Sequence, residues 1–107
     1  MKEIEHNTPL KLKDQIEYSA GQVVNRAVAQ DKNGQAFLLA VDKDASVKEH
    51  KADALAIMHA LEGEFILNIE GKEHKMKEGD SIILDPDVRH SLTPITPFKI
   101  ALVKINR

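Results

Sequence analysis

The chain contains no cysteine, which excludes disulfides, thiolate metal ligands and thiol nucleophiles. No apolar run approaches the ~18 residues needed to span a membrane. Residues 1–14 lack the apolar core of a secretory signal peptide. The net charge is −2, and lysine and arginine are interleaved with acidic residues instead of forming the basic patch that binds a phosphate backbone. These absences predict a cytoplasmic protein that binds neither nucleic acid nor a membrane.

Familiar catalytic signatures are missing as well. There is no P-loop, no glycine-rich dinucleotide fingerprint and no Ser-His-Asp arrangement. The 107 residues suffice for one domain, and 42% hydrophobic with 30% charged residues is usual for a globular protein. The composition therefore indicates a fold without indicating a reaction, and no catalytic residue is predicted.

Short apolar runs separated by turn signals make up most of the chain, and this spacing predicts an all-β sandwich or barrel. Asn33-Gly34 stands between the runs 22–30 and 35–42 and predicts a hairpin, because both turn residues tolerate a positive φ. Further strands are expected at 65–70, 72–76, 81–84 and 98–105.

The run from Ala54 to Leu61 is ambiguous. Alanine, leucine and methionine favour a helix, and Asp53 and Gly63 could cap and end it. Eight residues are short for a stable helix but normal for a strand buried on both faces. The neighbouring segments all indicate strands, so a strand is the more consistent prediction.

A sequence of motifs is ordered along residues 46–91. His50 precedes the apolar run, which ends in LEGE at 61–64; Glu-Gly follows at 70–71, Glu-Gly-Asp at 78–80, Asp-Pro at 85–86, and then His90. This order resembles the two-motif pattern of the cupin superfamily, single-domain type. The resemblance implies one domain over 1–107 folded as an all-β double-stranded β-helix (jelly-roll) barrel, with a peripheral or dimer-exchanging segment at 1–20. It also implies a homodimer.

The resemblance implies, in addition, where a divalent metal would bind. Cupins hold the metal with two histidines and a glutamate of the first motif and a third histidine of the second. Carried over, the first and third histidines are His50 and His90, whereas Ala52 and Ala56 occupy the places of the second histidine and the glutamate. Two imidazoles predict at most a weak site for zinc, nickel, iron or manganese, because catalytic sites use about three protein ligands.

Alternation along an extended strand predicts what surrounds the histidines. If His50 faces inward, then Ala52, Ala54, Ala56, Met58 and Ala60 do so too. We therefore predict a mostly apolar ligand pocket containing His50, His90, Met58, Ala52 and Ala56. Leu55, Ile57, His59 and Leu61 would face outward, which places His59 behind the barrel wall. That apolar outer face needs a cover, and a second subunit would provide it.

Three functional hypotheses follow. The first is a homodimeric barrel that binds a small molecule, with His50 and His90 as polar anchors. The alternative is a metal-dependent cupin enzyme, of the dioxygenase or isomerase type, with an atypical two-histidine site. A weaker third hypothesis is an accessory dimerisation or sensory module that acts through a partner protein.

Overall fold

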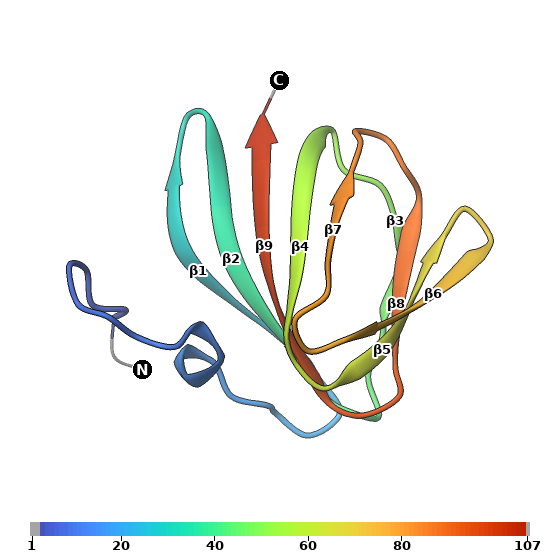
Figure 1. The fold of residues 1–107 in the computed structure, drawn as a ribbon, viewed down its shortest axis with the longest axis horizontal. Coiled ribbons are helices and arrows are strands. Elements are labelled where there is room, and N and C mark those ends of the chain that lie inside the picture. The colour runs from blue at the N-terminus through green and yellow to red at the C-terminus, as the bar shows by residue number, and fades with distance from the viewer. Residues whose placement is uncertain (1–2, 107) are drawn as a thin grey trace.

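A computed structural model describes residues 3–106 and consists of strands apart from one 3-10 turn near the N-terminus (Figure 1). No helix among these residues is long and apolar enough to cross a bilayer. The elements, in chain order, are η1 (Leu12–Gln15), β1 (Val23–Asp31), β2 (Gly34–Val41), β3 (Val47–His50), β4 (Ala54–Glu62), β5 (Glu64–Ile69), β6 (Lys72–Lys77), β7 (Ser81–Leu84), β8 (His90–Pro94) and β9 (Phe98–Asn106).

Two antiparallel sheets enclose the core. The larger sheet has the order β1-β2-β9-β4-β7 and the smaller one β3-β8-β5-β6. The chain crosses repeatedly between them, so that β9 returns to lie between β2 and β4 (Figure 1). The expected all-β jelly-roll architecture is confirmed, and each sheet presents one face to a shared interior.

The ambiguous run forms strand β4, as predicted. It pairs with β9 on one side and with β7 on the other, so its backbone polar groups are satisfied within the larger sheet. Ala54, Ala56, Met58 and Ala60 are buried, and the residues between them are more exposed. Long-range pairing therefore overrides the helical propensity of alanine and methionine.

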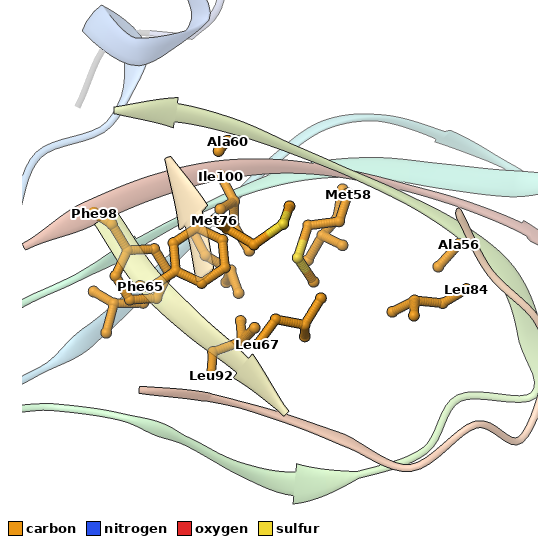
Figure 2. Packing of buried hydrophobic residues seen from close by; sticks show 13 residues of the cluster. Ala56, Met58, Ala60, Phe65, Leu67, Met76, Leu84, Leu92, Phe98 and Ile100 are labelled. Carbon is orange, nitrogen blue, oxygen red and sulfur yellow. The ribbon is translucent and has the colours of Figure 1, made fainter. Parts of the chain in front are cut away.

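The interior is filled most completely where the chain passes from β4 to β5. Phe65 and Phe98 are fully buried there, with stacked rings whose centroids are 4.2 Å apart. Figure 2 shows these two rings at one end of the core cluster and Ala56 with Leu84 at the other. We call the first region the packed end and the second the open end.

Both predicted hairpins form, but the turn between β1 and β2 does not use the two residues that the sequence predicts. Glu70 and Gly71 make a two-residue turn with φ of 49° and 90°, as their sequence suggests. The loop between β1 and β2 consists instead of Lys32 and Asn33, while Gly34 already pairs within β2. A Cβ at Gly34 would overlap the Lys104 carbonyl oxygen, so close approach of β9 accounts for this glycine.

The segment that contains η1 covers one part of the outer face of the larger sheet. Ile16 is buried against Leu38 and Ala40. The Tyr18 hydroxyl donates to Glu62 Oε2 at 2.6 Å, and Lys99 Nζ donates to the Lys13 carbonyl oxygen at 2.7 Å. Burial, followed by the Glu62 hydrogen bond and charge, raises the pKa of Tyr18, so this contact persists throughout the neutral range.

Candidate functional site

The open end of the barrel contains a cavity of about 260 Å³. Its wall is mostly apolar and is formed by both sheets. The apolar lining residues are Val23, Phe37, Leu39, Val47, Ala52, Ala56, Met58, Leu92 and Leu102, and the polar ones are Asn25, His50, His90 and Lys104. A concave apolar wall with few polar groups is the usual form of a small-molecule site.

The two histidines meet because strands β3 and β8 are neighbours. His50 and His90 are direct partners in this antiparallel pair, and their ring centroids lie 4.4 Å apart at an interplanar angle of 56°. The Asp87 amide donates to the Ala52 carbonyl oxygen at 2.8 Å, which joins the segments following β3 and preceding β8. His90 is buried at 7% exposure, whereas His50 is exposed. One imidazole therefore lies within the wall and the other at the mouth.

Backbone hydrogen bonds set the tautomer of both rings. Nδ1 of His50 lies 2.9 Å from the Lys48 carbonyl oxygen, and Nδ1 of His90 lies 3.0 Å from that of Val88. A carbonyl oxygen only accepts, so each Nδ1 carries the proton and donates. When a ring with this tautomer is neutral, its Nε2 is left as an acceptor for a ligand or a cation.

His90 is held in its neutral form. Burial lowers its pKa, and the nearby His50 and Lys104 lower it further, while the hydrogen bond to Val88 acts in the opposite direction. The fixed tautomer and the lowered pKa together make the His90 ring a neutral hydrogen-bonding group at physiological pH.

The structure brings all five predicted pocket residues together. His50, His90, Met58, Ala52 and Ala56 line this one cavity. Whether they bind a ligand stays a prediction.

Two polar lining residues, Asn25 and Lys104, were missed by the sequence reasoning. The signal for Lys104 lay in the alternation of β9, since Ile100 and Leu102 face inward and Lys104 has the same parity. Asn25 gave no comparable signal, because β1 has no fully buried residue to define its inner face.

His59 lies on the outer face of β4, as alternation predicts. Its Nδ1 is 2.5 Å from the Ser81 hydroxyl oxygen on the adjacent strand β7. It does not line the cavity, so it takes no part in the candidate site.

The comparison with known protein families agrees with this architecture. The model of the family described as the cupin domain matches residues 37–103, which is more than half of the chain. The chain belongs to the cupin family. A comparison of this cupin with curated proteins gives no match.

Solved structures share the fold over nearly the whole chain. A cupin superfamily protein from Desulfitobacterium hafniense is 22% identical with a TM-score of 0.91, and the match covers 99% of this chain and 97% of that one. A conserved protein of unknown function from Streptococcus pyogenes is 22% identical with a TM-score of 0.90, covering 99% and 93%. An RmlC-like cupin with a double-stranded β-helix fold from Methanocaldococcus jannaschii is 17% identical with a TM-score of 0.74, covering 85% and 86%.

The donor set of this cupin does not fit a resident divalent metal. Among residues 3–106, no three histidine, cysteine or acidic side chains are grouped so that they could hold a metal ion. Only the His50 and His90 rings of the expected ligand set lie together, and the remaining polar lining groups are an amide and an ammonium. An ammonium cannot coordinate a cation while protonated, and it repels one.

Proposed function

We propose that this cupin is a small-ligand-binding barrel whose mostly apolar pocket binds a small organic molecule, with His50 and His90 as polar anchors. The observation that carries the proposal is the cavity of about 260 Å³ around two adjacent imidazoles with fixed tautomers. A cavity of about 150 Å³ already holds benzene, so a molecule the size of one substituted ring fits here.

Small side chains in β4 and in the connection that precedes it support this proposal. Ala52 and Ala56 leave room where larger residues would fill the interior, and Met58 supplies an adaptable apolar surface. A fold that needed only a core would be more stable with the space filled, because a cavity costs about 24 cal/mol per Å³ when it is created in a packed core. Retention of the space is consistent with a binding role.

The test is a titration of uniformly ¹⁵N-labelled protein with single-ring probe compounds, followed by amide chemical shifts. We expect shifts concentrated around positions 50, 52, 56, 58 and 90. Ala56→Leu should weaken this binding, because the larger side chain occupies part of the cavity. Ala20→Leu, at an exposed turn position that does not line the cavity, is the matched control and should leave the shifts unchanged. Binding that Ala56→Leu leaves as tight as in the wild type, or that maps elsewhere, would contradict the proposal.

The metal-dependent enzyme is the alternative, and one observation favours it: the two acceptor Nε2 atoms belong to adjacent rings. Its weakness is the missing third ligand described above. Metal analysis of protein purified without chelator, with His50→Ala and His90→Ala alongside, tests it. A stoichiometric metal that both substitutions remove would support the enzyme, and no metal in the wild type would exclude this resident site.

We also propose that two copies form a homodimer through the uncovered outer face of the larger sheet. Ala36, Val103, Ile57 and Ile83 form one row across β2, β9, β4 and β7, and the next row contains Ile105 beside Leu55. These positions carry no charge, and Ile83 is 67% exposed. Large exposed apolar patches of this kind usually mark an interface, and twofold dimers are the commonest assembly.

Sedimentation velocity at micromolar concentration tests the dimer. We expect a dimer for the wild type and a shift towards monomer for Val103→Glu and Ile83→Glu, since a desolvated carboxylate opposes burial of this face. Ile95→Glu is the control, because Ile95 is 48% exposed but follows β8 in the smaller sheet. A wild-type monomer would refute the dimer.

A further inference from the structure

We infer that the pocket selects a small organic anion, whose charge is paired by Lys104. This inference rests on the proposed ligand-binding function and specifies the class of ligand. It derives from the position of Lys104, which lines the cavity from β9, whereas the other polar groups of the wall are Asn25 and the two histidines.

The position of Lys104 reverses the electrostatics of the expected metal site. Lys104 is the direct cross-strand partner of Ala56, the residue at the place implied for the cupin glutamate. Directly opposed residues of antiparallel strands share a face, with Cβ atoms about 5 Å apart. The site has therefore lost a carboxylate that would attract a metal ion and has gained a cation beside the same place.

Lys104 has no acidic partner within the described part of the chain. Its ladder neighbours are Gln35 and Ala56, and the two ion pairs among residues 3–106 involve other lysines. The ammonium lies 5.2 Å from the centre of the Phe37 ring, a cation–π distance that holds it beside the cavity. A cleft with one sign of charge and low-dielectric walls concentrates ligands of the opposite sign.

Three single-ring probes separate charge from shape: benzoate and benzamide, which are isosteric and at pH 7.5 are an anion and a neutral amide, and benzylamine, which is a cation of similar size. Each is titrated into ¹⁵N-labelled full-length protein in a low-salt buffer without competing carboxylates. We expect benzoate and benzamide to shift the pocket signals. Benzoate should have the lowest dissociation constant of the three probes. The preference over benzamide should be about tenfold, which corresponds to about 1.4 kcal/mol, and it should shrink as salt is added.

The variant Lys104→Gln keeps a long polar side chain but removes the charge. It should raise the dissociation constant of benzoate about tenfold, to that of benzamide, and leave the dissociation constant of benzamide unchanged. Lys72→Gln is the matched control, because Lys72 is an exposed lysine of β6 in the other sheet and does not line the cavity. This control should leave all three dissociation constants unchanged, and an equal loss in both variants would overturn the inference.

The remaining outcomes distinguish this inference from the function on which it rests. Equal binding of benzoate and benzamide in the pocket would overturn anion selection while leaving the ligand-binding proposal in place. Tighter binding of benzylamine would do the same. If no probe shifts the pocket signals at 10 mM, a concentration about 10,000-fold above a micromolar dissociation constant, both proposals would be overturned. Nickel titration that broadens the signals at positions 50 and 90 at equimolar metal would overturn anion selection in favour of the metal site.

Discussion

The two ends of the barrel interior are enclosed by the same pair of sheets and differ in the side chains that face inward. At the packed end, Phe65 and Phe98 fill the space between the sheets and no water-sized gap separates their stacked rings. At the open end, alanines at 52 and 56 leave a cavity with His50, His90 and Lys104 around it. Both ends lie between the same two sheets, so the side chains that face inward decide whether the interior becomes core or pocket.

This difference indicates that the two ends of the barrel interior serve different purposes. The packed end supplies the apolar burial that stabilises the fold, since a fully buried phenylalanine is among the largest single contributions to a core. The open end can then hold polar groups and empty space at a tolerable cost in stability. Paired substitutions at equivalent residue types in the two ends test this directly.

Phenylalanine truncation should give the largest contrast. Phe65→Ala should lower the free energy of unfolding by about 3–5 kcal/mol, because it leaves a cavity in close-packed surroundings. Phe37→Ala, at the half-buried rim of the open end, should lower it by only about 1 kcal/mol, because less apolar area is lost. Urea denaturation measures both. Equal losses would show that the two ends are not energetically distinct.

Glycine substitution at the passage between the sheets should give the next largest effect. Gly63 has a φ of 82°, and a Cβ there would lie 2.9 Å from the Phe98 Cα. Gly63→Ala should therefore lower stability by about 3 kcal/mol through backbone strain and overlap. Gly71→Ala is the control, with a φ of 90° but open space around it, and should cost about 1–2 kcal/mol. If the two variants were equally stable in urea, close packing at Gly63 would not matter.

Replacing an alanine by leucine should lower the unfolding free energy more at the packed end, which has little free volume, than at the open end. Ala60→Leu, at a fully buried position of the packed end, should cost about 1–3 kcal/mol through overpacking. Ala56→Leu extends into the cavity and should change the unfolding free energy by less than about 1 kcal/mol. Thermal unfolding followed by circular dichroism ranks the two. A larger loss for Ala56→Leu would mean that the cavity cannot accept a side chain.

The pH dependence near neutrality should be the smallest effect, and His90 at the open end contributes to it. The pKa of His90 is lower in the folded state than the ordinary value of about 6.5, so the unfolded state takes up the proton first. This contribution to stability is complete above about pH 7 and decreases as the pH falls through 6.5 towards the folded-state pKa.

Urea denaturation between pH 7.5 and 5.5 measures this decrease. His90→Gln removes the titrating group and should flatten the curve over that interval, whereas His6→Gln, at an exposed position near the N-terminus, should not. An unchanged slope in His90→Gln would assign the pH dependence to other groups.

Much of the fold could be predicted because local patterns agreed with one another. The strand at β4 could be inferred from its neighbours although its own residues favour a helix, and the Glu70-Gly71 turn followed from turn chemistry. The role of Gly34 could not be inferred in this way, because the strand that approaches it lies about seventy residues further along the chain, at Lys104 and Ile105. Sequence patterns report local geometry better than close contacts between distant segments.

The residues of the site could likewise be predicted only where a motif carried the information. His50 and His90 could be placed together because motif register carries that information, and their ring contact agrees with it. Lys104 escaped notice because a lysine near the end of a largely apolar strand suggests a solvated side chain, and only the closure of the barrel places it at the cavity. Covering of Leu38 and Ala40 by Ile16 likewise depends on where the N-terminal segment returns to the sheet.

The register of β9 determines which charge faces the cavity. Lys104 is fixed opposite Gln35 on one side and Ala56 on the other, and Val103 points the opposite way. A single-residue insertion or deletion upstream in this strand, if it were absorbed by slippage of the backbone ladder, would turn Lys104 to the other face. The ammonium would then reach the outer surface, and Val103 after an insertion, or Ile105 after a deletion, would take its place inside. Pocket polarity and surface polarity in this barrel are thus coupled, and neither can change by slippage without the other.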